Sequence, residues 1–331
     1  MKTYIIAEIG INHEGLLSRS KKLIKIAKLA GANAVKFQLF EPETLASDKS
    51  KKTNDQNKLM KKETLFDMWK RVKLSSDELL ILKKYAKKNN IDFFCSVFDF
   101  PSLEIVKKLK INTIKIASSD ITDIPLLKKI AKTKMKIFLS TGMASLKEIN
   151  KALKILGKNK LTLLHCVSLY PCPLNKANIK RMIKLKKKFN VKIGYSDHCE
   201  GIDASLIAIN NGASVIEKHF TDDKKRKGAD HKLSADFSDL KQIVEYSNSK
   251  DTIMGDGIIN PKKDELNMRK FARKSLFYDK DLNYKQKIKF EDIKIRRPFG
   301  EMEPIKIYSI INKKLKQSVK KGEIVKKKHF M

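Results

Sequence analysis

The sequence predicts a (β/α)₈ barrel followed by a small C-terminal domain. Eight apolar runs of strand length recur between residues 4 and 220, and the segments between them carry apolar residues at three- and four-residue spacing. Continuous apolar strands that alternate with helices indicate a parallel sheet covered on its outer face. A barrel of this kind takes about 250 residues. The alternative, a doubly wound sheet, would open with a glycine-rich dinucleotide turn, and "EIGINHEG" at 8–15 is not one.

The predicted strands follow one another with helical segments between them. They cover residues 4–9, 34–40, 92–98, 113–118, 136–141, 161–167, 191–196 and 214–220. The second connection is too long for a simple crossover and contains a polar stretch at 47–64. Because long loops in compact domains are usually functional or disordered, we expect a mobile, substrate-covering loop within 41–75.

The pattern of long apolar runs alternating with helical segments ends at about residue 250. We predict a barrel domain over 1–250, a linker over 251–270 and a small domain of short strands and turns over 271–331. A domain of about 60 residues is marginal alone. We therefore expect it to pack against another domain or subunit.

Composition excludes several classes of protein. The net charge is +35, but only eight of the 72 basic residues are arginine and the lysines are spread over the whole chain, which argues against specific nucleic-acid binding. No apolar run reaches the roughly 18 residues of a membrane span, and the N-terminus does not read as a secretory signal. The four cysteines have neither metal-site nor disulfide-framework spacing. These features predict a cytoplasmic protein with reduced thiols.

Nearly every predicted strand ends in polar residues, and barrel enzymes carry their active sites at these ends. This is the main argument from the residues themselves for an enzyme. The strand-end residues are Glu8, Asn12, His13, Lys36, Gln38, Ser96, Phe98, Asp99, Lys115, Ser118, Ser119, Asp120, Ser140, Thr141, Ser168, Tyr170, Ser196, Asp197, His198, Glu217, Lys218 and His219.

The residue types at these strand ends indicate the chemistry of the site that they would form. Two lysines and several hydroxyl groups suit a small phosphate or carboxylate. His198 and His219 end adjacent strands and could hold one divalent metal, with Asp197 and Glu217 available to orient them. Each histidine taken alone would more often be a hydrogen-bonded core imidazole. The pair on neighbouring strand ends favours a metal.

Several motifs resemble the sialic acid synthase family, which makes N-acetylneuraminate, legionaminate and pseudaminate. The resemblance runs from residue 3 to about 325. Its motifs are "AEIGINHEG", "VKFQLF", "STGMASLKEI", "LLHCVSLYP", "IGYSDHCEGI", "EKHFT" and "KGADHKLSAD", and near the C-terminus "ARKSLF", "IRRP" and "KKGEIV". The last three are similar to the family's antifreeze-like domain, which has a β-clip type fold.

The resemblance implies condensation of phosphoenolpyruvate with an N-acetylmannosamine-type sugar, giving a nine-carbon 2-keto acid and phosphate. His198 and His219 match ligands of Mn²⁺ or Mg²⁺, and Glu8 and Glu217 match carboxylates at the reacting centre. Arg297 matches an arginine that reaches the partner's active site in a domain-swapped homodimer. The remaining expected substrate contacts are Lys36, Ser96, Phe98, Lys115, Ser118, Asp120, Ser140, Ser168, Tyr170, Ser196 and Asp230.

Two other functions are compatible with parts of the sequence. A phosphoenolpyruvate-dependent or aldolase-type condensation on another sugar, such as that of the pseudaminate branch, uses the same strand ends. A carbohydrate- or ice-binding protein built on the small domain would leave those ends unexplained. Ser168 and "RRPFGEMEP" at 296–304 depart from the family pattern where sugar is bound, so N-acetylmannosamine and a 2,4-diacetamido sugar both stay open.

Overall fold

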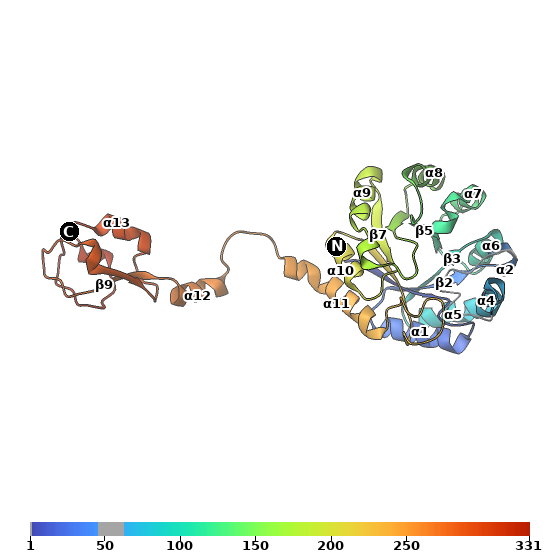
Figure 1. Cartoon of the computed structure of the whole chain (residues 1–331), viewed down its shortest axis with the longest axis horizontal. Helices are drawn as coiled ribbons and strands as arrows, with labels where there is room; N and C mark the ends of the chain where they lie inside the picture. The colour runs from blue at the N-terminus through green and yellow to red at the C-terminus, as the bar shows by residue number, and fades with distance from the viewer. Residues whose placement is uncertain (1, 46–62) are drawn as a thin grey trace. The chain divides into compact units, whose positions relative to one another are not determined.

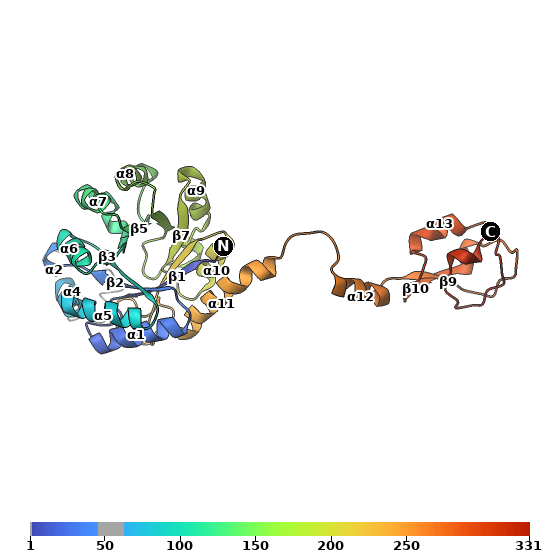
Figure 2. The same cartoon turned by 180° about the vertical axis from the view of Figure 1, so that it is seen from behind.

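A computed structural model describes residues 2–45 and 63–331 and divides the chain into two compact units, Met1–Gly255 and Asp256–Met331. Figures 1 and 2 show both units from opposite sides, and each is described by itself. The predicted substrate-covering loop falls largely on residues 46–62, which lie outside the described residues.

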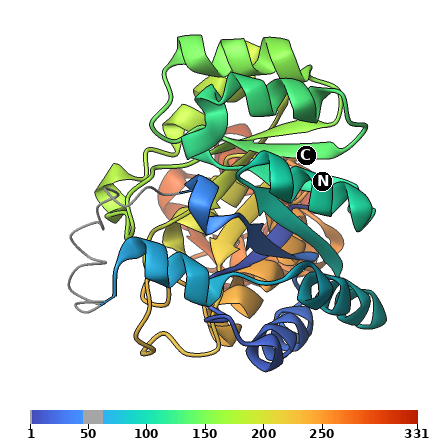
Figure 3. The ribbon, with the colours of Figure 1, turned by 90° about the vertical axis from the view of Figure 1, so that its right-hand side faces the viewer.

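The first unit is the predicted barrel: eight strands, all parallel, that close where β1 pairs with β8. Helices surround the strands (Figure 3). Each strand overlaps one predicted apolar run. The strands are β1 (Tyr4–Gly10), β2 (Ala34–Leu39), β3 (Asp92–Val97), β4 (Thr113–Ile116), β5 (Lys136–Ser140), β6 (Leu161–His165), β7 (Lys192–Asp197) and β8 (Val215–His219).

The helices begin at residues suited to capping. Ser75 and Ser145 form reciprocal capping boxes with Glu78 and Glu148, and Asp99 accepts the Ser102 amide at the start of α6. In the described part of the chain, no helix is long and apolar enough to cross a membrane. Among the described residues, the helices of this unit are α1 (Leu17–Leu29), α2 (Pro42–Leu45), α4 (Leu65–Val72), α5 (Ser76–Lys88), α6 (Phe100–Lys108), α7 (Ile124–Ala131), α8 (Leu146–Leu156), α9 (Lys180–Phe189), α10 (Asp203–Asn210) and α11 (Phe237–Met254).

Aromatic side chains fill the barrel interior beneath the polar strand ends. Phe94 and Phe138 are fully buried, with ring centroids 5.4 Å apart. Phe94 is the register partner of Lys36, and Phe138 is that of Lys115, so each pair points to the same side of the sheet. The lysines therefore lie beside an apolar layer, where a charge needs a partner.

The second unit has its own small core around an antiparallel pair of strands, β9 (Ser275–Tyr278) and β10 (Ile293–Arg296). Leu276, Tyr278, Ile288, Leu315 and Val325 are buried in this core. The unit also contains α12 (Lys263–Ala272), α13 (Ile307–Ile310) and the 3₁₀ turns η3 (Phe290–Asp292), η4 (Pro304–Lys306) and η5 (Lys327–His329).

The segment predicted as a linker, residues 251–270, is largely helical. It holds the end of α11 and most of α12, and the unit boundary falls at 255/256. The charges of α12 are placed as the helix dipole favours. Acidic Asp264 and Glu265 lie in its first turn, and basic Arg269 and Lys270 lie in its last.

We predict that Gly194→Ala destabilises the barrel by about 1–3 kcal/mol, because β7 and β8 approach too closely there for a side chain. A Cβ at Gly194 would lie 2.5 Å from the Val215 carbonyl oxygen and 2.8 Å from the Val215 Cβ. Thermal unfolding should show a Tm several degrees lower. Lys192→Ala, at an exposed position of the same strand, is the control. Equal Tm values for the two variants would contradict the prediction.

Candidate active site

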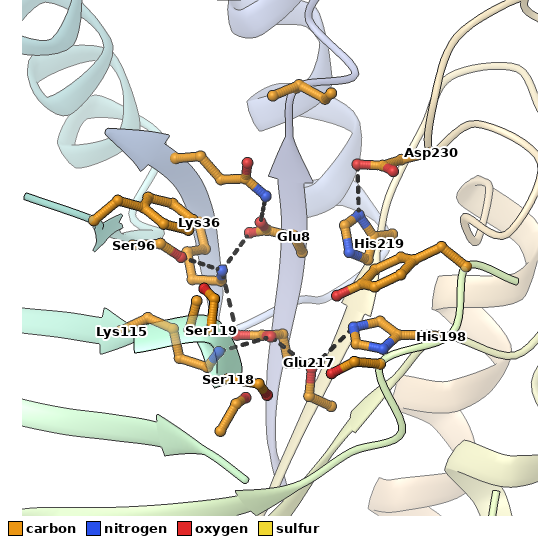
Figure 4. Close-up of a pocket in the computed structure, with 18 of the residues that line it drawn as sticks. Glu8, Lys36, Ser96, Lys115, Ser118, Ser119, His198, Glu217, His219 and Asp230 are labelled. Carbon is orange, nitrogen blue, oxygen red and sulfur yellow. Dashed lines mark hydrogen bonds and ion pairs between the residues drawn. The ribbon is translucent and has the colours of Figure 1, made fainter. Parts of the chain in front are cut away.

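A cavity of about 360 Å³ opens at the carboxyl ends of the barrel strands (Figure 4). It brings together most of the residues that the sequence singled out, although they lie far apart along the chain. The predicted residues that line it are Glu8, Lys36, Ser96, Phe98, Lys115, Ser118, Ser140, Ser168, Tyr170, Ser196, His198, Glu217, His219 and Asp230.

One predicted substrate contact of the barrel unit, Asp120, does not line this cavity, and neither do the strand-end residues Asn12, His13, Asp99, Thr141, Asp197 and Lys218. Asp120 lies on the 3₁₀ turn η1 (Ser118–Thr122), which begins two residues after β4 ends. The turn places Ser118 and Ser119 at the cavity and carries Asp120 past it. Arg297 belongs to the second unit, where it is exposed.

The cavity also has an apolar side that the strand ends did not predict. Its residues come from loops and from α4, and Trp69 is among them. The stretch "LFDMWKRV" at 65–72, capped by Thr64, is a signal that could have revealed this helix. The lining residues that the sequence did not single out are Ile11, Trp69, Ala117, Met143 and Ala229, whereas the strand-end residues Gln38 and Ser119 line the cavity as expected.

Strand alternation explains why acidic and basic residues follow each other at the ends of β7 and β8. Successive side chains point to opposite faces of a strand. Ser196 and Glu217 are register partners and line the cavity, whereas Asp197 and Lys218 are register partners and do not. The prediction that Asp197 faces the cavity mouth was therefore wrong, since it lies one residue out of phase.

A chain of buried charges crosses the cavity. Lys36 Nζ lies 3.0 Å from Glu8 Oε2 and 3.5 Å from Glu217 Oε2, and it donates a hydrogen bond to Ser96 Oγ at 2.7 Å. Lys115 Nζ lies 3.6 Å from Glu217 Oε1. Figure 4 shows Lys36 between the two carboxylates. Lysine and glutamate are rarely buried this fully unless they are paired, and here they pair with each other.

The two carboxyl groups have opposite pKa shifts. Burial raises the pKa of Glu8 despite its contact with Lys36. Burial would also raise the pKa of Glu217, but Lys115 and Lys36 outweigh it and hold that pKa at about 2. Glu217 is therefore ionised at neutral pH, while Glu8 takes up a proton more readily. Carboxyl groups whose pKa values are pushed apart can serve different roles in acid–base chemistry.

His198 and His219 lie side by side at the cavity, with ring centroids 5.6 Å apart. Burial lowers the pKa of His198 to about 4, and burial together with His198 lowers that of His219 well below its usual value, so both imidazoles are neutral. His198 Nδ1 lies 2.9 Å from the Val167 carbonyl oxygen, and His219 Nδ1 lies 3.5 Å from Asp230 Oδ2. The Tyr170 ring lies 4.3 Å from that of His198.

Hydroxyl groups crowd the side of the cavity near Lys115. The Oγ atoms of Ser140 and Ser168 are buried and have no hydrogen-bond partner among residues 2–45 and 63–331, and Ser118 Oγ accepts the Gly142 amide at 2.9 Å. Gly142 is required here because a Cβ would lie 2.2 Å from Ser168 Oγ. Unpaired buried hydroxyls are costly, so this wall is suited to a ligand rich in acceptor oxygens.

A cavity of this composition at the carboxyl ends of barrel strands defines a barrel enzyme. The chain belongs to the NeuB family, whose family model matches residues 23–259. It is 40% identical to the N,N'-diacetyllegionaminic acid synthase of Campylobacter jejuni over 98% of this chain and 99% of that protein. A pseudaminic acid synthase of the same species is 34% identical over 99% and 97% of the two chains.

A solved structure agrees with these sequence relationships. The crystal structure of N-acetylneuraminic acid (sialic acid) synthetase from Leptospira borgpetersenii has a TM-score of 0.72 and 36% identity to this chain. The match covers 81% of this chain and 90% of that one. The expected family and the barrel fold are confirmed.

We predict that Asp120→Asn stabilises the protein by about 1–2 kcal/mol at pH 8 and that the gain fades toward pH 4. Burial raises the pKa of Asp120 to about 6, although Ser119 hydrogen-bonds to it. Between the unfolded pKa of about 4 and pH 6 the folded state binds more protons, so wild-type stability falls as pH rises.

Urea unfolding at the two pH values measures this difference. Glu104→Gln, which removes an exposed carboxyl that pairs with Lys107, is the control. A gain for Asp120→Asn that is equal at both pH values, or absent at both, would refute the assignment.

Proposed function

We propose that the chain condenses phosphoenolpyruvate with an N-acetylmannosamine-type sugar, giving a nine-carbon 2-keto acid and phosphate. The observation that carries this proposal is the charge chain from Glu8 through Lys36 and Glu217 to Lys115, which lies between a hydroxyl-rich wall and two neutral histidines. The names of the relatives support the class of product. Identity of 40% to a legionaminate-type synthase against 34% to a pseudaminate-type synthase favours the former branch.

The hydroxyl-rich wall is suited to the phosphate and carboxylate of phosphoenolpyruvate. Lys115 is buried, and burial lowers its pKa, so a bound anion would favour the charged form of this lysine and accept a charge-assisted hydrogen bond from it. Ser140 and Ser168 have buried hydroxyls that would donate to the ligand's oxygens. Ser96 and Lys36 continue the same wall.

The carboxylates are placed to stabilise positive charge that develops on the substrate. In the proposed reaction, C3 of phosphoenolpyruvate forms a bond to the sugar's aldehyde carbon, and C2 becomes cationic. The former aldehyde oxygen takes up a proton and becomes a hydroxyl group. Water adds to C2: one of its protons offsets the proton taken up by that oxygen, the other leaves with the phosphate and its bridging oxygen, and C2 becomes a ketone. Ionised Glu217 would stabilise C2 electrostatically, and Glu8, whose pKa is raised, could hold the proton that the added water releases.

His198 and His219 fit a divalent metal such as Mn²⁺ or Mg²⁺. Both are neutral, and the Val167 carbonyl fixes the His198 ring through Nδ1 while its Nε2 has only a long 3.5 Å contact with Ser196 Oγ. Among the described residues, His219 Nδ1 has no hydrogen-bond partner and lies 3.5 Å from Asp230 Oδ2. Within residues 2–45 and 63–331 no group of three or more His, Cys, Asp or Glu is arranged to hold a metal, so water and substrate would complete the coordination. A bound metal would polarise the sugar's aldehyde oxygen.

We further propose that the second unit is an antifreeze-like domain that acts across a homodimer. Arg297 is exposed in this unit, and α12 has no buried residue. Leu266, Met268 and Phe271 of α12 are exposed apolar side chains that another surface could cover. A guanidinium at this position is suited to the sugar's amide oxygen.

The four cysteines support a cytoplasmic site of action. All four are free and buried in the barrel unit. The backbones of Cys172 and Cys199 pair in an isolated parallel β-bridge. Their side chains are nevertheless free thiols and form no disulfide. Reduced neighbouring thiols are typical of a reducing compartment.

We expect phosphate release that requires phosphoenolpyruvate, an N-acetylated mannosamine-type sugar and a divalent metal together. A panel of N-acetylmannosamine and 2,4-diacetamido sugars would identify the acceptor. Chelation should abolish turnover and Mn²⁺ should restore it. His219→Ala should lower kcat/KM by at least about 100-fold with an unchanged fold by circular dichroism. Full activity in chelator would exclude the metal role, and phosphate release without any sugar would exclude the condensation.

We also predict that Arg297→Ala raises the KM for sugar by about 10- to 100-fold and leaves the KM for phosphoenolpyruvate unchanged. Arg296→Ala is a matched control, because Arg296 pairs with Asp279 inside its own unit. Mixing Arg297→Ala and His219→Ala chains should restore activity if the arginine acts on the partner's cavity. If the subunits exchange and no activity returns, the arginine does not act in trans.

A further inference from the structure

A second pair of charges lies directly behind the cavity, on the outer face of the same two strands. Asp197 on β7 and Lys218 on β8 are register partners, both fully buried, with Lys218 Nζ 3.3 Å from Asp197 Oδ2. Neither residue lines the cavity. The proposed reaction therefore gives this pair no direct contact with substrate.

The pair is bonded to the backbone that leaves β7. Asp197 Oδ1 accepts the Cys199 amide at 2.8 Å, and Lys218 Nζ donates to the Cys199 carbonyl oxygen. Asp197 Oδ2 also accepts the Ser205 hydroxyl of α10 at 2.6 Å. Both polar groups of the Cys199 backbone are thus held by one buried ion pair.

His198 lies in the chain between Asp197, a member of the pair, and Cys199, whose backbone the pair holds. Its carbonyl oxygen accepts the Cys172 amide at 2.9 Å, and its imidazole Nδ1 lies 2.9 Å from the Val167 carbonyl oxygen. His219 directly follows Lys218. Each member of the buried pair is therefore the chain neighbour of one cavity histidine, one on each strand.

The energetics argue against a purely stabilising role for the pair. Removing two charges from water costs several kcal/mol per ion, and apolar residues of similar volume are often equally stable or better in such a place. The outer face of a barrel strand is normally apolar because helices cover it. An apolar pair could not supply an acceptor for the Cys199 amide or a donor for the Cys199 carbonyl oxygen.

We propose that Lys218 and Asp197 are positioning residues: they fix the backbone from Asp197 to Cys199 and thereby set the separation of the His198 and His219 imidazoles. This inference rests on the proposed function, in which those imidazoles hold a divalent metal. Partners that orient metal ligands typically change metal affinity by about 10- to 100-fold when they are removed. Small displacements matter because the two ligands must meet one ion.

The first test compares Lys218→Met with the double variant Lys218→Met/Asp197→Asn. The single variant leaves a buried carboxylate unpaired, so it should lose both stability and Mn²⁺ affinity. The double variant removes the unpaired charge and should recover much of the Tm. We expect its Kd for Mn²⁺, measured by electron paramagnetic resonance, to stay about 10- to 100-fold above that of the wild type.

Two further variants keep the test decisive if Lys218→Met does not fold. Ser205→Ala removes one bond to Asp197 while keeping both charges, and it should weaken Mn²⁺ binding by a smaller factor. Lys250→Met is the control, because Lys250 Nζ donates to the carbonyl of Ile209 near the C-terminal end of α10 at 3.1 Å and contacts neither member of the buried pair. It should leave Mn²⁺ affinity unchanged.

Hydrogen–deuterium exchange of the metal-free protein separates this inference from the metal assignment. Peptides that span 197–205 should exchange faster in the double variant and in Ser205→Ala, but not in Lys250→Met. If wild-type protein binds no Mn²⁺, the metal assignment fails and the exchange result alone decides the positioning role. Mn²⁺ affinity that returns with Tm in the double variant, or unchanged exchange in both variants, would overturn the proposal.

Discussion

The charged groups of the cavity depend on the ammonium group of Lys36. It lies between two carboxylates that would otherwise repel each other in an apolar barrel. Its Nζ is 3.0 Å from Glu8 and 3.5 Å from Glu217. The other interactions at the strand ends attach to this centre: Gln38 donates to Glu8 at 3.0 Å, and Ser196 donates to Glu217 at 2.8 Å. Hydrophobic walls make each of these contacts stronger than it would be in water.

The charge balance of the cavity indicates how it could accept an anion. Lys36 and Lys115 offset Glu8 and Glu217 when both carboxylates are ionised. A ligand with a carboxylate and a phosphate adds several negative charges, which two lysines already in use do not compensate. The raised pKa of Glu8 lets that group take up a proton, and the neutral histidines leave room for a divalent cation. Both responses move the cavity toward neutrality.

Much of this arrangement could be predicted because the sequence shows both where the strands run and which residues follow them at the barrel mouth. Apolar runs buried on both faces identify the strands, and a polar residue that follows such a run must lie at the barrel mouth. The same logic could not separate Ser196 from Asp197, or Glu217 from Lys218, since the phase of alternation depends on register across the closed sheet. The same logic misplaced Asp120, because a 3₁₀ turn replaces the extended chain after β4.

Most of the apolar side of the cavity could not be placed from the strand ends, because loops and the separate helix α4 build it. Trp69 reaches the cavity from α4, and its ring meets Phe40 edge-on at a centroid distance of 4.7 Å. Phe98 packs on the same Phe40 ring at 6.3 Å. Lysines and serines line the cavity together with these aromatic residues. Such a cavity suits a reaction that joins a small multiply charged anion to a neutral sugar with acyl substituents, since the anion needs charge and hydroxyls while acyl methyl groups favour apolar contact.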